Sequence, residues 1–167
     1  MARQVLGERV RKEVPVRRMI VLLTLAGVLA ALLMVVGPAT AQTSDGSNLA
    51  LPTVLHAQMV GEREVPPGDP NGFGRATIIL IPPDTICYTL TAHRIAPATA
   101  AHIHFGPPGV AGPIVVPLAP PTYGVSGGCT SADPEVVANI AANPFVYYVN
   151  VHNDPYPLGA IRGQLHY

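Results

Sequence analysis

Two histidines, His102 and His104, stand two positions apart among apolar residues. On a β-strand the side chains of residues i and i+2 point to the same face, so the two imidazoles are expected to lie side by side. A third imidazole from another strand, with His152 as the candidate, would complete a metal site for copper or zinc, because imidazole nitrogen suits both ions. Alternatively, the three side chains form a hydrogen-bonded polar cluster that holds no metal.

Four more polar residues are predicted to form a structural polar cluster around these histidines. They are Glu64, Asn150, Arg162 and Gln164. Strand periodicity places Asn150 on the same face as His152, and Arg162 on the same face as Gln164. The guanidinium of Arg162 has five N–H donors and is suited to an acidic partner; Glu64 and Asp154 are the candidates, and Glu64 is the one we expect.

Beyond these residues the sequence holds no complete set of catalytic groups, so it favours a protein that is not an enzyme. The stretch Gly124–Gly128 matches the G-x-S-x-G pattern of hydrolases, but that motif needs a strand, a helix and a large α/β sheet around it. We interpret it as a flexible Ser/Gly turn. Glu64 lacks the second positioned carboxylate that general acid–base chemistry would use.

The N-terminal part of the chain has the pattern of an export signal. Six basic residues precede an uncharged apolar run of 18 residues, Met19–Val36, and Ala39-Thr40-Ala41 supplies small residues for cleavage. We predict a signal peptide at 1–41, a flexible lead-in at 42–52 and one domain at 53–167. An uncleaved membrane anchor is the alternative, since the run is close to membrane-spanning length. Both readings put the domain outside the cytoplasm, secreted, periplasmic or at the cell envelope.

The charge of the exported part excludes one class of partner. From Gln42 onward the chain has four arginines, no lysine and eight acidic residues, a net charge of −4. Nucleic-acid binding requires a basic face that neutralises phosphates, so no nucleic-acid partner is expected.

Both cysteines, Cys87 and Cys129, lie in the exported part. An even number of cysteines in an oxidising compartment favours a disulfide, and two buried free thiols are the alternative. A bridge would close a loop of about 40 residues and contribute about 3–4 kcal/mol in the chain-entropy model.

Short apolar segments separated by proline and glycine predict an all-β fold. Seven of them have strand length and composition: Thr53–Val60, Gly74–Ile81, Thr85–His93, Thr99–Phe105, Pro113–Leu118, Phe145–His152 and Ala160–His166. One short helix is predicted from Pro134 to Ala142, with Asp133 as its N-cap. We expect a Greek-key β-sandwich of seven to eight strands with this one helix.

Several motifs, taken in order, resemble the chordin-type (CHRD) domain. They are Glu64-Val65-Pro66-Pro67, Gly74-Arg75-Ala76, Ala101-His102-Ile103-His104, Gly112-Pro113-Ile114-Val115-Val116, Tyr148-Val149-Asn150-Val151-His152 and Gly159-Ala160-Ile161-Arg162-Gly163-Gln164-Leu165. The resemblance covers about Thr53 to Leu165. It implies a β-sandwich found in exported bacterial proteins and in a secreted growth-factor antagonist, and it implies no particular chemistry.

A second resemblance, to copper–zinc superoxide dismutases, is confined to His102, His104 and His152. It implies a copper-type histidine set, but this sequence offers no matching bridging histidine and no zinc loop. We therefore predict a non-enzymatic binding or structural module of the extracytoplasmic space, with no cofactor and with an unidentified protein or surface ligand as its partner. The alternative is a dismutase-like protein that binds copper or zinc.

Overall fold

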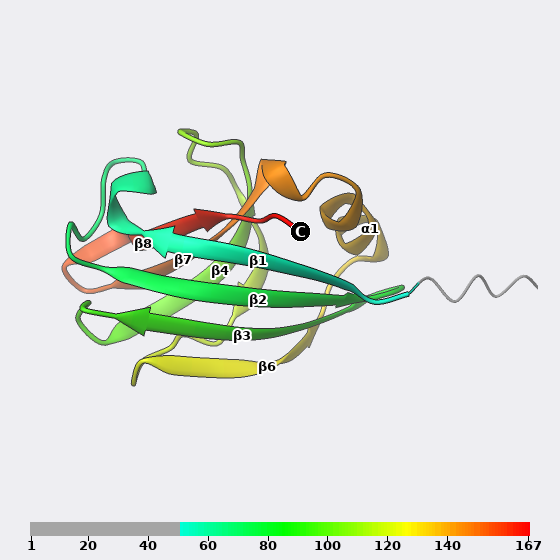
Figure 1. The fold of residues 1–167 in the computed structure, drawn as a ribbon, viewed down its shortest axis with the longest axis horizontal. Helices are drawn as coiled ribbons and strands as arrows, with labels where there is room; N and C mark the ends of the chain where they lie inside the picture. The colour runs from blue at the N-terminus through cyan, green and yellow to red at the C-terminus, as the bar shows by residue number, and fades with distance from the viewer. Residues whose placement is uncertain (1–50) are drawn as a thin grey trace, which may run out of the picture. The chain divides into compact units, whose positions relative to one another are not determined.

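The computed structural model describes residues 51–167 (Figure 1). The predicted signal peptide at 1–41 and nearly all of the predicted lead-in at 42–52 lie outside the described residues. The elements in chain order are β1 (Thr53–Val60), η1 (Gly61–Arg63), β2 (Phe73–Ile81), β3 (Thr85–His93), β4 (Ala98–Phe105), β5 (Ile114–Leu118), β6 (Val125–Ser131), α1 (Pro134–Ala142), η2 (Pro144–Val146), β7 (Tyr147–Asn153) and β8 (Tyr156–Gln164).

The eight strands form one antiparallel sheet in the order β5-β4-β7-β8-β1-β2-β3-β6. The sheet folds over at the sparse β8–β1 junction, where Val60 and Arg162 are the paired residues. One layer therefore contains β6, β3, β2 and β1, and the other contains β8, β7, β4 and β5 (Figure 1). The links β3–β4, β5–β6 and β6–β7 pass between the layers, so the predicted all-β sandwich with one short helix is confirmed.

The core lies between the two layers and is built from alternate residues of each strand. Strand β1 shows the pattern clearly, because Leu55, Ala57 and Met59 are buried while the residues between them are exposed. The largest apolar side chains that are fully buried are Leu55, Met59, Ile78, Leu80, Ile86, Leu90, Ile103, Ile140, Ile161, Leu165 and Val116. Period-2 patterning of this kind fixes which face of each strand turns inward.

Helix α1 has the bounds and the cap that the sequence predicts. The Asp133 side chain accepts a hydrogen bond from the backbone N–H of Glu135 at 2.8 Å, and proline occupies the first turn. Val137 and Ile140 are the buried residues of the helix and join the core. Within residues 51–167, no helix has both the length and the apolar character needed to cross a membrane.

The interpretation of Gly124–Gly128 as a flexible turn is wrong, because most of this segment belongs to β6. Strand β6 pairs along its length with β3, from Thr85 opposite Ser131 to Thr91 opposite Val125. Its sequence contains two adjacent glycines, and glycine is depleted in strands. The pairing edge of β3 supplies the hydrogen bonds that the local sequence does not predict.

A disulfide joins β6 to its neighbour. Cys87 in β3 and Cys129 in β6 are direct cross-strand partners, and their sulfur atoms are bonded. The bridge links positions 42 residues apart in the sequence, as predicted. It fastens an outer strand with little apolar side-chain area to the rest of the sheet.

Candidate metal centre

The predicted site residues gather on the outer face of the layer that contains β4, β7 and β8. Strand pairing places His102 opposite Asn150, and Asn150 opposite Arg162. The next row places His104 opposite Tyr148, and Tyr148 opposite Gln164. Together with His152 and Glu64, these residues form a group that we call the polar layer. It holds every residue predicted for the metal site and for the structural polar cluster.

Two connecting segments cover most of the polar layer. The loop at 106–113 hydrogen-bonds to it, because the backbone N–H of Gly112 donates to the Tyr148 hydroxyl at 3.2 Å. The segment at 61–72 is tied to β8 by a backbone bond from Asp69 N–H to the Ala160 carbonyl at 2.9 Å. Asn150 and Arg162 are consequently 2% and 1% exposed, although they stand on the face that points away from the core.

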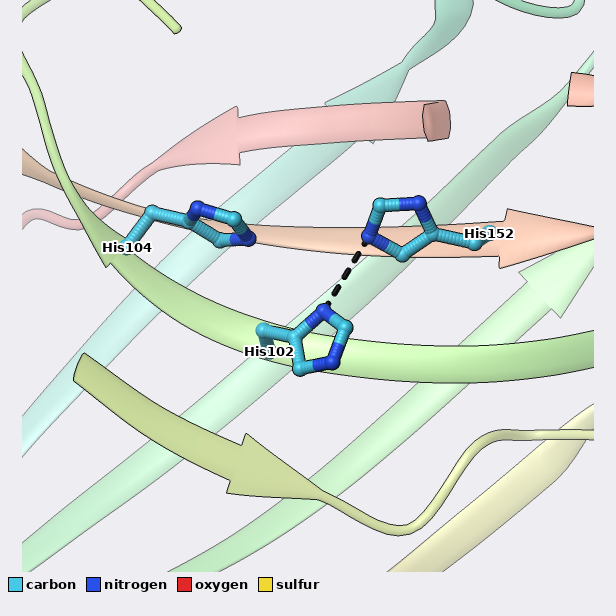
Figure 2. Close-up of side chains that lie close together, drawn as sticks. All are labelled: His102, His104 and His152. Carbon is cyan, nitrogen blue, oxygen red and sulfur yellow. Dashed lines mark hydrogen bonds between the residues drawn. The ribbon is translucent and has the colours of Figure 1, made fainter. Parts of the chain in front are cut away.

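The three predicted metal ligands come together in space. His102 and His104 extend from β4 and His152 from β7, with the three rings turned toward one another (Figure 2). One ring nitrogen of each lies within 4.8 Å of the corresponding nitrogens of the other two. The closest pair is His102 Nδ1 and His152 Nε2, at 3.1 Å.

Backbone carbonyls orient two of the rings. His104 Nδ1 lies 2.8 Å from the Gly112 carbonyl, and His152 Nδ1 lies 3.1 Å from the Pro157 carbonyl. A carbonyl oxygen only accepts hydrogen bonds, so in the neutral imidazoles both Nδ1 atoms carry the hydrogen. The Nε2 atom of His104 therefore presents a free lone pair, and the Nε2 atom of His152 accepts a hydrogen bond from His102 Nδ1. A partner on the second ring nitrogen is how metal-binding histidines are usually held in place.

All three imidazoles favour the neutral form that binds a metal. The pKa of His102 is lowered to about 4, chiefly by burial and to a smaller extent by the charges of His152 and His104. Burial also lowers the pKa of His104 and of His152, against the opposing effects of their carbonyl partners. At neutral pH a cation therefore has few protons to displace from these rings.

The Nε2 atom of His104 is the feature of the cluster that most directly indicates a bound ligand. His104 is buried, and its Nε2 has no hydrogen-bond partner among residues 51–167. A buried acceptor without a partner costs free energy that a bound cation would recover. A tetrahedral ion with metal–nitrogen bonds of about 2.0–2.1 Å holds its ligand nitrogens about 3.3 Å apart. Small side-chain adjustments would bring the three nitrogens to that spacing.

Arg162 lies beneath the loop at 106–113 and holds it in place. Its guanidinium donates to the carbonyls of Val110 and Pro107, both at 2.9 Å, and its Cζ lies 3.4 Å from the centre of the Tyr148 ring. Tyr148 in turn stacks on His104, with ring centres 4.8 Å apart. Arginine, tyrosine and histidine thus form one continuous stack beside the histidine cluster.

Gln164 completes the attachment of this loop to the neighbouring chain. Its side-chain amide donates to the Gly106 carbonyl at 2.7 Å and to the Phe145 carbonyl at 3.0 Å. The Gln164 oxygen accepts a weaker bond from Arg162 at 3.4 Å. Gln164 therefore links β8 both to the loop at 106–113 and to η2.

Glu64 does not form the hydrogen bond with Arg162 that the sequence led us to expect. The hydrogen bonds of Arg162 go to backbone carbonyls and to Gln164, and Glu64 acts on Arg162 only as a nearby charge. The Glu64 side chain is 5% exposed, and its Oε1 has no hydrogen-bond partner in the part of the chain that the structure describes. Burial raises the pKa of Glu64 to about 7, and the Arg162 charge, the Asn150 amide and the Val65 N–H only partly oppose this shift.

Three contributors to the site were not singled out from the sequence. Tyr148 lies two residues before Asn150 in β7, so strand alternation is the signal that could have placed it in the layer. The carbonyls of Gly112 and Pro157 carry no signal in the sequence, because any residue supplies a carbonyl. Their positions depend on how two loops fold back over the sheet.

These features define a class of protein: an antiparallel β-sandwich with a covered polar layer that includes three neutral histidines. The family model for the CHRD domain matches residues 55–165, and the chain belongs to the CHRD domain family. No curated protein and no solved structure matches the chain.

Proposed function

We propose that this CHRD-domain protein is a non-enzymatic binding module of the extracytoplasmic space, and that its ligand is one copper or zinc ion. The observation that carries the proposal is the meeting of three neutral imidazoles on one face of the sheet. Their ligand nitrogens lie within 4.8 Å of one another, and the buried Nε2 of His104 has no hydrogen-bond partner within the described residues. His102, His104 and His152 would hold the ion.

Export is supported by two independent features. The sequence at 1–41 has a basic start, an apolar run and small residues at its end, which is the pattern of a signal peptide. The Cys87–Cys129 bond is of a kind that persists in oxidising compartments and is rare in the cytosol.

The ligand chemistry favours copper or zinc over harder ions. All three ligands are imidazole nitrogens, and sites for magnesium or calcium are built from oxygen. Two of the three rings are already oriented by carbonyls, so binding requires little ordering of side chains. His102 and His152 are only partly buried, which leaves a route for the ion from solvent.

Metal stoichiometry tests the proposal. We would load the purified protein with Cu(II) or Zn(II), remove loosely held ions by gel filtration, and measure retained metal by mass spectrometry. About one ion per chain is expected in the wild type, and loss of that ion is expected in His102→Ala and His152→Ala. His93→Ala is the matched control, because His93 is exposed and lies outside the cluster. Wild-type protein that retains no metal would overturn the proposal.

A further inference from the structure

Tyr148 contacts His104 directly and also through Gly112. The tyrosine and the histidine are cross-strand partners on β7 and β4, and their rings are stacked, with centres 4.8 Å apart and planes inclined by 9°. The Tyr148 hydroxyl accepts a hydrogen bond from the backbone N–H of Gly112 at 3.2 Å. The carbonyl of Gly112 in turn lies 2.8 Å from His104 Nδ1 and accepts its hydrogen bond. The ring of Tyr148 therefore supports the imidazole, and its hydroxyl holds the residue that orients the imidazole.

Gly112 has to lie very close to the end of β4 for this arrangement. A Cβ atom at this position would collide with the backbone carbonyl of Phe105, so the loop comes nearer to the strand than a side chain would allow. Gly112 lies outside the regular elements. The Tyr148 hydroxyl therefore takes the place of a strand partner for its backbone N–H.

The position of Tyr148 is fixed by its own surroundings. Its side chain is 3% exposed, and the Cζ atom of Arg162 lies 3.4 Å from the centre of its ring. A Cβ atom at Gly106 would come within 3.2 Å of Tyr148 Cε1, so the start of the covering loop packs against the ring. A side chain held this closely is already ordered, and binding of an ion to its neighbour then costs little further entropy.

Resting on the metal site proposed above, we propose that Tyr148 is a positioning residue of that site, which keeps the His104 ring turned toward His102 and His152 (Figure 2). Within the described residues, no hydrogen bond at His104 Nε2 determines which way the ring turns. The orientation is set at the other ring nitrogen by the Gly112 carbonyl and on the ring face by Tyr148. Outer contacts of this kind fix the tautomer and the direction of a metal-binding imidazole.

His152 provides an internal comparison. Its Nδ1 lies 3.1 Å from the Pro157 carbonyl, and this contact involves neither Tyr148 nor Gly112. A change at Tyr148 should therefore affect the ring of His104 and leave the ring of His152 unaltered. A general loosening of the sheet would affect both rings.

Tyr148→Phe tests the proposal, because it removes the hydroxyl and keeps the ring. In the metal-free wild type at neutral pH, nitrogen NMR should show His104 and His152 with their hydrogens on Nδ1. In Tyr148→Phe, His104 should populate both tautomers while His152 keeps its hydrogen on Nδ1. The Kd for Zn(II), measured by competition with a chelator, should rise about tenfold, the lower end of the range for outer contacts of metal-binding histidines.

Tyr88→Phe is the matched control. The Tyr88 hydroxyl also accepts a hydrogen bond from a backbone N–H outside the strands, that of Ala119 at 2.8 Å, but Tyr88 lies on β3 and outside the histidine cluster. This variant loses a bond of the same kind, so it controls for the cost to the fold. It should keep the His104 tautomer and the Kd for Zn(II) of the wild type, and urea unfolding checks that both variants are folded.

Hydrogen exchange in the wild type gives a second readout that needs no variant. An ion bound to His104 should hold the Gly112 carbonyl more firmly, and with it the bond from Gly112 N–H to Tyr148. Zn(II) should therefore slow exchange of the Gly112 amide severalfold more than exchange of the Ala119 amide. Equal effects on the two amides would contradict the inference.

The outcomes distinguish this inference from the proposed function. Wild-type protein that retains no Zn(II) contradicts the metal site and the inference with it. An unchanged Kd for Zn(II), or an unchanged His104 tautomer, in folded Tyr148→Phe overturns the inference and leaves the metal site standing. Equal weakening in Tyr148→Phe and Tyr88→Phe does the same, because the effect then belongs to the fold as a whole.

Discussion

Replacing Glu64 by glutamine should change how the stability of the metal-free protein depends on pH. The folded state raises the pKa of Glu64 from 4.5 to about 7. Between these values the native chain binds more protons at this position than the unfolded chain does. The free energy of unfolding contributed by Glu64 therefore falls as pH rises through this window. Glutamine has nearly the same shape and no charge, so the variant should lose this component.

The size of the effect follows from the shift. Each pKa unit corresponds to about 1.36 kcal/mol, so a shift from 4.5 to about 7 amounts to about 3 kcal/mol once the carboxyl is fully ionised. Going from pH 4.5 to pH 8, the wild type should therefore lose about 3 kcal/mol of stability relative to Glu64→Gln. The pKa values of the three histidines are lowered in the folded state, so their contribution to the free energy of unfolding falls as pH drops below 6.5. They are common to both proteins and cancel in the difference.

Urea unfolding of both proteins in the presence of a chelator, at intervals from pH 4.5 to 8, measures this difference. Glu62→Gln removes a charge from an exposed neighbour and should leave the pH profile of the wild type unchanged. If instead the wild type gained stability over Glu64→Gln as pH rises, Glu64 would be ionised and paired with Arg162 in the folded protein. That result would refute the account of Glu64 given above.

Three further substitutions test other parts of the fold. Arg162→Met should lower the free energy of unfolding by about 3 kcal/mol in urea titrations, because it removes both donors that hold the covering loop; a loss under 1 kcal/mol would contradict this role. Gly159→Ala should cost about 2 kcal/mol or more by thermal melting, since φ is 143° there and the added Cβ would strike the Glu64 carboxyl. Cys87→Ser with Cys129→Ser should cost about 4 kcal/mol for a loop of 42 residues, measurable against the oxidised wild type; equal stability of the two would show that the bridge constrains little.

Most of the fold could be predicted from the sequence, because alternation of apolar residues and turn-forming residues marks each strand directly. Strands Thr53–Val60 and Thr85–His93 and helix Pro134–Ala142 have the predicted bounds. Strand β6 could not be predicted, because its stability comes from pairing with β3 and from the disulfide. Those are long-range contacts, and a local window of sequence does not contain them.

For the site, the sequence predicted which side chains share a face, and it named Glu64 as the expected partner of Arg162. Period-2 spacing put Asn150 with His152 and Arg162 with Gln164, and the pairing of β4, β7 and β8 brought these sets together. The expected Glu64–Arg162 hydrogen bond is replaced by bonds from Arg162 to the carbonyls of a loop. Backbone carbonyls are present at every residue, so only the folded loop could identify them as the partners.

The sequence by itself determined the class of fold and which residues of a strand share a face. It also determined the set of polar residues that face away from the core. Only the tertiary structure decided that this outward face is covered, because the covering segments at 61–72 and 106–113 have no regular pattern of their own. Covering the face turns ordinary strand residues into buried ones. Burial is the first cause of the lowered histidine pKa values and of the raised pKa of Glu64, and it gives the three histidines the chemistry of a candidate metal site.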